Sequence, residues 1–264
     1  MPDSNLTPIY HITYAPSTNA VSLFFWGCNM SCRGCYCQRR IYSTMLGDYV
    51  DHNLQAPRGL AAPPARFLDY QEVINILDQV EVKEVTLEGQ EATIYPGYSQ
   101  LTAELHRRYG SFNILLTNGL RLPELKDTDR VGFGLKAVTE SLHRRYTGID
   151  NGEIIEHLEE IHRRNIPLVV ESVYIPDFID GAETELIAQY LASLDKDTGY
   201  IILPYFQAGD NPWRRPLPDE MRSAGRTAKQ YLKNVLFFTG EEKLEYEVVS
   251  LFPTDIHHGA NQGS

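Results

Sequence analysis

Long hydrophobic runs and a basic leader are both missing from this 264-residue chain. No apolar stretch reaches the ~18 residues from which a membrane-spanning helix is recognised. Residues 1–10 are polar and contain a proline, without the basic segment and apolar core of a signal peptide. We therefore expect a cytoplasmic protein that is not embedded in a membrane.

Basic residues are scarce as well. Lys and Arg together number 24 against 35 Asp and Glu, which gives a formal net charge of -11. An acidic chain repels the phosphates of nucleic acids and anionic lipids, so a broad face that binds either is not expected. The remaining composition, 42% hydrophobic and 22% charged, is that of a globular protein rather than a disordered or fibrous one.

Cysteine is absent outside one short segment, which holds Cys28, Cys32, Cys35 and Cys37. Disulfides that hold a fold together join distant segments, so this spacing argues against a disulfide framework. Soft thiolates on a short loop are typical ligands of iron–sulfur clusters and of zinc. A structural zinc site with all four thiols stays open as an alternative, although zinc sites usually pair two knuckles that lie farther apart.

Short apolar runs of strand length alternate with helical patterns from about residue 20 onward. Strands are expected over residues 21–26, 84–87, 112–117, 131–136, 167–174 and 200–203. Helices are expected over residues 71–80, 99–108, 152–161, 186–194 and 218–233. Such alternation predicts βαβ units and a parallel sheet, here a single α/β domain shaped as a partial or full barrel of about six units.

Three segments, residues 1–19, 47–66 and the tail 253–264, depart from this alternation. We expect residues 1–19 to be an irregular lead-in, residues 20–210 the barrel core, and residues 211–264 a C-terminal helix and tail. Residues 47–66 are rich in Pro and Gly, which is typical of a mobile or functional loop, and His257 and His258 are expected to lie exposed in the tail. The sequence leaves open whether residues 235–238 add a further strand.

The segment Cys28-x3-Cys32-x2-Cys35, directly after the first expected parallel strand, resembles the radical S-adenosylmethionine (radical SAM) enzymes. It is most similar to the small activases of glycyl-radical enzymes, typified by the activase of pyruvate formate-lyase, and to activase-like relatives. The resemblance implies a partial (β/α)6 TIM-like barrel in which Cys28, Cys32 and Cys35 hold one [4Fe–4S] cluster and SAM binds the open iron. One electron then cleaves SAM to methionine and a 5′-deoxyadenosyl radical, which abstracts a hydrogen atom.

Further segments continue this resemblance over roughly residues 20–210. Residues 89–93 resemble the family's G-G-E-P-T, residues 117–119 its T-N-G turn, residues 134–136 its D-L-K, and residues 203–206 its L-P-Y-H. Because ligands bind at the carboxyl ends of parallel strands, we expect these segments to converge on one rim. The resemblance implies that SAM is contacted by Tyr36, Gly89, Glu91, Thr117, Asn118, Lys136 and Glu171, and that Lys136 is also the candidate catalytic residue.

Several positions depart from the family pattern. Gln90 and Ala92 replace Gly and Pro, Gly134 replaces Asp, Asp177 replaces the Gly after Pro176, and Phe206 replaces His. Cys37 matches no family position and is interpreted as a small buried hydrophobic side chain.

The substrate stays open among three interpretations. The first is a glycyl residue of a partner enzyme, the second is a small molecule or another polypeptide, and the third, from a different class, is a zinc- or cluster-binding interaction module without catalysis. All four cysteines lie in one loop, so we expect no second cluster and an external flavodoxin or ferredoxin as electron donor. Such acidic donors are expected to dock on basic side chains near the cluster, namely Arg33, Arg39, Arg40, Arg214 and Arg215.

Overall fold

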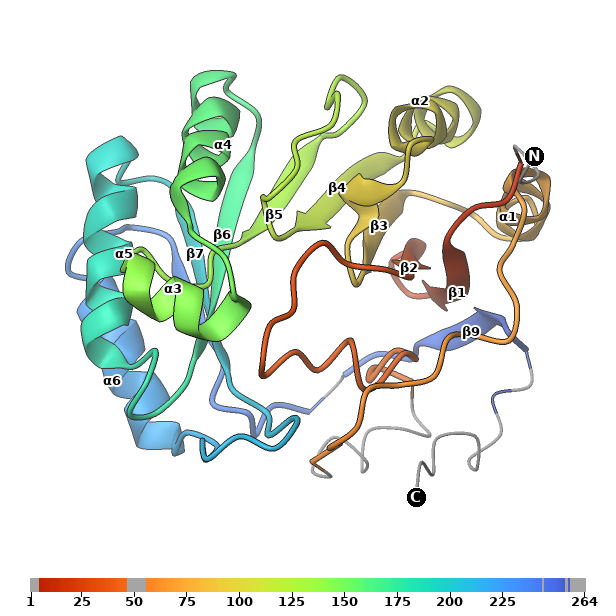
Figure 1. Cartoon of the computed structure of the whole chain (residues 1–264). Coiled ribbons are helices and arrows are strands. Elements are labelled where there is room, and N and C mark those ends of the chain that lie inside the picture. Colours follow the sequence, from red (N-terminus) through yellow and green to blue (C-terminus); the bar gives the residue numbers. More distant parts are fainter. Residues whose placement is uncertain (1–4, 47–55, 244, 255, 257–264) are drawn as a thin grey trace.

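The computed structural model describes residues 5–46, 56–243, 245–254 and 256. Within these residues the strands form one sheet in the order β8-β7-β6-β5-β4-β3-β2-β1-β9. Strands β2 to β8 run parallel to one another, whereas β1 at one end of the sheet pairs antiparallel with both β2 and the edge strand β9. The sheet curves into an open barrel that carries helices on its outer side (Figure 1).

The elements follow the expected alternation. The strands are β1 (Ile9–Ala15), β2 (Ala20–Phe25), β3 (Glu84–Gly89), β4 (Phe112–Thr117), β5 (Arg130–Gly134), β6 (Leu168–Tyr174), β7 (Gly199–Pro204), β8 (Val235–Phe237) and β9 (Val249–Phe252). The helices are α1 (Tyr70–Leu77), α2 (Tyr98–Tyr109), α3 (Glu140–Thr147), α4 (Gly152–Arg163), α5 (Gly181–Leu194) and α6 (Pro218–Ala228), with the short 3-10 helix η2 (Ala92–Ile94) after β3. The expected α/β partial barrel with a mainly parallel sheet is therefore confirmed.

The core lies between the sheet and the helices on its outer side. In α4, Ile154, Leu158 and Ile161 recur at helical spacing and are fully buried. In β3, Val85 and Leu87 are fully buried against this layer, while the alternate side chains face the inside of the barrel. This alternation leaves the inner face free to carry polar groups.

The expectation of an irregular lead-in over residues 1–19 is wrong, because β1 is a fully buried strand. It pairs with β2 through a local turn and with β9 at its other side. His11 and Thr13 lie on the inner face of β1. These polar residues interrupt the apolar pattern by which a buried strand is recognised in a sequence. The ring Nδ1 of His11 hydrogen-bonds the carbonyl of Phe252 over 2.7 Å, a contact between residues 241 positions apart.

Other boundaries also differ from expectation. Helix α3 was not expected, and α6 ends at Ala228 rather than near residue 233. Residues 235–237 do add a strand, β8, at the edge of the sheet. Residues 56–66 contain neither helix nor strand, whereas residues 47–55, His257 and His258 lie outside the described residues.

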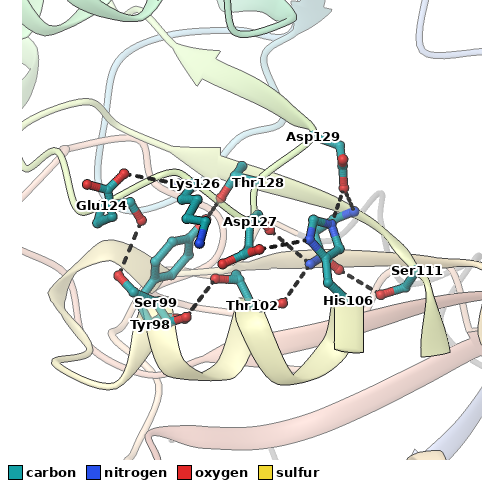
Figure 2. Close-up of polar contacts among 11 residues, drawn as sticks. Tyr98, Ser99, Thr102, His106, Ser111, Glu124, Lys126, Asp127, Thr128 and Asp129 are labelled. Carbon is teal, nitrogen blue, oxygen red and sulfur yellow. Dashed lines mark hydrogen bonds and ion pairs between the residues drawn. The ribbon is translucent and has the colours of Figure 1, made fainter. Parts of the chain in front are cut away.

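The connection between β4 and β5, residues 118–129, contains no helix and is fastened to α2 instead. His106 of α2 hydrogen-bonds Asp127 and Asp129, at 3.2 and 2.7 Å, and Asp129 also accepts from the backbone N–H of Asn113 (Figure 2). Nearer the start of α2, the hydroxyls of Tyr98 and Thr128 lie 2.7 Å apart. These contacts close the outer side of the barrel where a helix is missing.

No helix among the described residues is long and apolar enough to cross a bilayer.

Candidate cofactor site at the cysteine loop

The cysteine loop, residues 27–38, begins at the carboxyl end of β2. In Figure 1 the red-orange trace leaves β2, runs towards α3 and then turns back. The backbone N–H of Arg33 donates to the carbonyl of Tyr146 in α3 over 2.9 Å. The loop therefore crosses the rim formed by the carboxyl ends of the strands, where parallel barrels hold their ligands.

The thiols of the loop interact electrostatically. Cys35 acts on Cys28 and Cys32, Cys28 also acts on Cys32, and the ammonium of Lys136 acts on all three. Burial raises the pKa of the Cys28 thiol and raises that of Cys32 to about 12, which Lys136 partly opposes. The cation of Lys136 thus favours the thiolates that a soft metal group requires.

These residues fit a thiolate-bound cluster better than a single ion. Among the described residues, no three His, Cys, Asp or Glu side chains are close enough to one another to hold one metal ion. A four-iron cube separates its thiolates more widely than one zinc ion does, and the three linked thiols are the soft donors that iron–sulfur clusters take. We therefore favour the cluster over the structural zinc alternative.

Side chains from other loops fix the shape of the cysteine loop. The amide oxygen of Gln90 accepts from the backbone N–H of Gly27 over 3.0 Å, and Gly27 has a φ of 100°. A Cβ on Gly34 would come within 2.8 Å of the Tyr205 ring, so the loop after β7 packs directly on the cysteine loop. Gln90, a departure from the family pattern, therefore has its own contact with the loop.

Glu91 fastens two neighbouring strand ends to each other. Its carboxylate, on a residue 1% exposed, accepts from the backbone N–H and hydroxyl of Thr93, the hydroxyl of Thr117 and the backbone N–H of Asn118. These four contacts are between 2.6 and 3.1 Å long. Glu91 therefore holds the rim together, and its predicted contact with the SAM ammonium stays a prediction.

Asn118 joins this rim to the cysteine loop. Its side-chain amide donates to the Sγ of Cys28 over 3.5 Å and to the Oδ1 of Asn29 over 2.7 Å. Its own Oδ1 accepts from the backbone N–H of Leu120. Thr117 is buried and bonded to Glu91, so of these two predicted residues Asn118 is the one beside the thiols.

Lys136 reaches towards the thiols because the neighbouring position has no side chain. A Cβ on Gly134 would lie 2.9 Å from the Lys136 Nζ, so the Asp expected there from the family would displace the lysine amine. Glu183 of α5 accepts from the backbone N–H groups of Val138 and Thr139 at 2.7 and 2.9 Å and fixes the loop that carries Lys136.

Glu171 lies on the inner face of β6, opposite Gly134 in the register of β5 and β6. Burial raises the pKa of its carboxyl, and the ammonium of Lys136 opposes the shift. The carboxyl pKa of Glu88 on β3 is also raised by burial and, more weakly, by Glu171. Glu171 thus interacts with both the Glu88 carboxyl and the Lys136 ammonium on the inner face of the barrel.

Tyr36 and Gly89 lie together at the wall of a cavity of about 630 Å³ on the inner face of β1, β2 and β3. Tyr36 also packs edge-on against Phe206, with ring centres 6.3 Å apart, and the guanidinium of Arg215 covers Phe206 at 4.5 Å. Phe206, which replaces the family's His, therefore contributes an aromatic contact. The cavity wall also carries polar side chains, among them Ser22, Cys37, Arg40, Glu84, Thr86 and Glu88.

The basic side chains near the loop are only partly free for a partner. Arg33 is exposed and its guanidinium lies 5.1 Å above the Trp213 ring, and exposed Arg214 pairs with Glu220. Arg39 donates to the carbonyl of Cys35 and supports the loop from within. Arg40 and Arg215 are half-buried, so Arg33 and Arg214 are the exposed members of the expected patch.

Sequence reasoning missed several residues of this site. Glu88 was not singled out, although the alternation Glu84, Thr86, Glu88 within a strand indicates a polar inner face. Cys37 was expected to be a buried hydrophobic side chain, but it is exposed towards the cavity, which corrects that expectation. Asp177, which replaces the family's Gly, has a φ of 62°, a backbone shape that Asp tolerates better than most residues.

Comparisons with known proteins agree with this geometry. The model of the radical SAM superfamily matches residues 23–188. A protein of Methanocaldococcus jannaschii, provisionally named glycyl-radical enzyme activating enzyme, is 25% identical over 237 residues, which cover 85% of this chain and 82% of the relative. The isethionate sulfite-lyase activating enzyme of Oleidesulfovibrio alaskensis is 30% identical over 152 residues, which cover 52% of this chain and 48% of that enzyme.

Solved structures share the fold. A domain of the pyruvate-formate lyase-activating enzyme of Bacteroides vulgatus matches with a TM-score of 0.50 at 17% identity, covering 59% of this chain and 99% of that domain. A radical SAM methyltransferase of Sphaerobacter thermophilus matches with a TM-score of 0.55 at 14% identity, covering 86% of this chain and 68% of that protein. Two other neighbours contain bound SAM. Because the family model matches more than half of its length, the chain belongs to the radical SAM superfamily, whose members use a [4Fe–4S] cluster and SAM.

Proposed function

We propose that this radical SAM enzyme is an activase that takes a hydrogen atom from a glycyl residue of a partner enzyme. The observation that carries the proposal is the match to a relative named as such an activase along most of both chains. The shorter match to an isethionate sulfite-lyase activating enzyme supports the same class of substrate. We further propose that the enzyme works in the cytoplasm, since an oxygen-sensitive cluster requires a reducing compartment.

Cys28, Cys32 and Cys35 are the proposed cluster ligands. Their thiols are under the electrostatic influence of the Lys136 ammonium, and Asn118 donates to the Cys28 sulfur. When bound and reduced, the cluster supplies one electron that splits SAM into methionine and a 5′-deoxyadenosyl radical, which takes a hydrogen atom from the substrate to give 5′-deoxyadenosine. The four cysteines of this chain lie in one loop, so the electron must come from outside the chain.

The proposed SAM site lies between the cysteine loop and the strand ends. Tyr36 offers a ring for the adenine and Gly89 allows close approach of the backbone, since both line the cavity. The hydrogen bonds that converge on Glu91 hold Thr117 and Asn118 in place, and the Asn118 side chain in turn is hydrogen-bonded to the cysteine loop. Glu91 thus orients the site even without touching SAM.

Lys136 and Glu171 are the proposed polar pair nearest to the reacting groups. The ammonium of Lys136 is positioned to hold a carboxylate, either that of SAM or one on the substrate, because it faces both the thiols and Glu171. Glu171 is proposed to balance this positive charge inside the barrel. The catalytic assignment of Lys136 rests on this position.

A second candidate function is the modification of a small molecule. The cavity of about 630 Å³ favours it, because this volume holds a compact substrate and its wall carries hydroxyls and carboxyls that can select one. In either case the proposed electron donor is a flavodoxin or ferredoxin that approaches Arg33 and Arg214, the exposed basic residues near the loop.

The first test is the formation of 5′-deoxyadenosine by anaerobically purified, reconstituted protein with SAM and dithionite. Wild type should form 5′-deoxyadenosine. In Cys32→Ala the rate of its formation should fall at least about 1000-fold, because the cluster loses a ligand. Addition of a candidate glycyl-radical enzyme should then produce a radical doublet in electron paramagnetic resonance (EPR) spectra. Formation of 5′-deoxyadenosine with no doublet, but with a labelled small molecule consumed, would instead support the second candidate.

A further inference from the structure

Asn118 brings a hydrogen-bond donor from the end of β4 to the cysteine loop. It directly follows β4 and lies 90 positions from Cys28 in the sequence. Its side-chain amide nitrogen is 3.5 Å from the Sγ of Cys28 and 2.7 Å from the Oδ1 of Asn29. The nitrogen carries two hydrogens, so it can donate to both acceptors at once.

The backbone determines which end of the Asn118 amide faces the sulfur. The backbone N–H of Leu120 donates to the Asn118 Oδ1 over 2.9 Å. A flipped amide would set its nitrogen against this N–H, where two donors would face each other. The oxygen is therefore turned towards Leu120 and the nitrogen towards Cys28.

The backbone of Asn118 is also held in place. Its N–H donates to the Oε2 of Glu91 over 2.8 Å, and the same carboxylate accepts from the hydroxyls of Thr117 and Thr93. Asn118 is only 8% exposed, so water competes little for its amide. These contacts keep the donor beside the Cys28 sulfur.

The Cys28 sulfur accepts from a second donor within the cysteine loop itself. The backbone N–H of Met30 lies 3.4 Å from the Sγ of Cys28. A side-chain substitution leaves this backbone donor present, whereas it can remove the amide of Asn118. The contribution of Asn118 can therefore be measured while the Met30 bond remains.

We propose that the Asn118 amide donates a hydrogen bond to the cluster-ligating sulfur of Cys28 and thereby raises the reduction potential of the cluster. The proposal rests on the ligand set of the proposed function, and it is separate from the contact with SAM predicted for Asn118. A donor to a ligand sulfur withdraws electron density from it and stabilises the reduced, more negative cluster. Asn118 is thus a positioning residue that acts through Cys28 and makes the cluster easier to reduce.

The test is a redox titration of the reconstituted protein without SAM, followed by EPR of the reduced cluster. Leaving SAM out keeps any contact between SAM and Asn118 from affecting the potential. Asn118→Leu removes the donor at similar side-chain size, and Asn118→Ala removes it by truncation. In both variants we expect the reduction equilibrium to shift about three- to tenfold against the reduced form, which is a potential lower by about 30 to 60 mV for one electron.

Thr93→Val is the matched control. Thr93 is buried and its hydroxyl donates to the Glu91 carboxylate over 2.6 Å, the same carboxylate that holds the backbone of Asn118. Valine keeps the size of the side chain and removes this hydroxyl, while the Asn118 amide stays present, so the potential should equal that of wild type. Iron content per chain should be equal in wild type and all three variants, because none removes a proposed ligand.

Three results would overturn the inference. The first is an unchanged potential in both Asn118→Leu and Asn118→Ala. The second is an equal shift in Thr93→Val, because a loosened strand end rather than the lost hydrogen bond would then set the potential. The third is loss of iron from both Asn118 variants, which would make Asn118 a support of the loop. By contrast, a wild-type protein that takes up no cluster contradicts the proposed function itself, so the iron content of the wild type tells the two failures apart.

Discussion

Two polar networks hold opposite ends of β4, and they differ in what surrounds them. The rim network consists of Glu91, Thr93, Thr117 and Asn118 at the carboxyl end of the strand. The outer network consists of His106, Asn113, Asp127 and Asp129 near the amino end. Figure 2 shows His106 of α2 facing Asp127 and Asp129 of the β4–β5 connection. Both are dense, and both replace missing regular structure with side-chain hydrogen bonds.

The two networks differ in how deeply their side chains are buried and in which groups lie next to them. Glu91 is 1% exposed and accepts only from neutral donors, whereas His106 is partly exposed to water and bridges two carboxylates. Asn118 of the rim network also contacts the Cys28 sulfur. The contrast teaches that a dense hydrogen-bond network does not by itself mark a functional site; contact with the thiols and the cavity does.

The strongest test of this contrast is Glu91→Ala. The substitution leaves two buried backbone N–H groups and two hydroxyls without their acceptor, which should lower the free energy of unfolding by about 3 kcal/mol or more. Iron content after reconstitution should fall as well, because the strand end that holds Asn118 against Cys28 is released. Urea denaturation of the apoprotein and iron analysis measure the two effects.

Glu91→Gln is the control that keeps the size of the side chain. It keeps one carbonyl acceptor and should lose less stability than Glu91→Ala. Equal stability of wild type and Glu91→Ala would show that the rim network does not hold the site.

His106→Ala should give the next largest effect on stability, about 1 to 2 kcal/mol near pH 6, because two hydrogen bonds to carboxylates disappear. Iron content and 5′-deoxyadenosine formation should stay at wild-type levels, since the outer network does not contact the thiols. Loss of the cluster in His106→Ala would contradict the conclusion that the rim network supports the cofactor site and the outer network does not.

The stability that His106 contributes should depend on pH. Burial lowers the pKa of His106, but hydrogen bonds to Asp129 and Asp127 outweigh it and raise the pKa above 6.5. A raised folded-state pKa means that the contribution is complete below about pH 6.5 and is lost as the pH rises through the folded value. Denaturation of wild type and His106→Ala at a series of pH values should therefore show a difference in free energy of unfolding that becomes smaller as the pH rises.

Gln90→Ala removes one hydrogen bond between the loop after β3 and the start of the cysteine loop. We expect a stability loss of about 1 kcal/mol and a several-fold faster release of iron to a chelator. Gln79→Ala, on an exposed glutamine after α1, is the matched control and should change neither quantity. Iron release at the wild-type rate would show that Gly27 keeps its place without Gln90.

The smallest effect on stability is expected from neutralising Arg33 and Arg214 with Gln. The fold should be unchanged within about 0.5 kcal/mol, since both side chains are exposed. Reduction by a flavodoxin should slow several-fold and lose part of its salt dependence, because an acidic donor loses its electrostatic attraction. Neutralising Arg107 and Arg163, exposed on α2 and α4, is the control; equal slowing there would indicate a net-charge effect.

The sequence predicted most of the barrel correctly. Alternating apolar runs located β2 to β7 within a few residues, because a parallel strand buried on the outer face leaves a continuous local signal. β1 was missed because His11 and Thr13 interrupt its apolar pattern and because its outer partner, β9, lies near the other end of the chain. α3 was missed because its buried residues include His143, Tyr146 and Thr147 rather than an aliphatic stripe.

The sequence alone indicated that the cofactor would be bound by thiolates, and its resemblance to the radical SAM enzymes implied a [4Fe–4S] cluster with SAM. Thiol softness and the spacing of Cys28, Cys32 and Cys35 are properties of residue type and local order, so they needed no structure to be recognised. Only the tertiary structure decided that Glu91 binds Thr117 and Asn118, that Gln90 holds Gly27, and that Cys37 lines the cavity. The physical reason is that a hydrogen bond depends on which chain segments folding brings within about 3 Å of each other, and no local pattern records that.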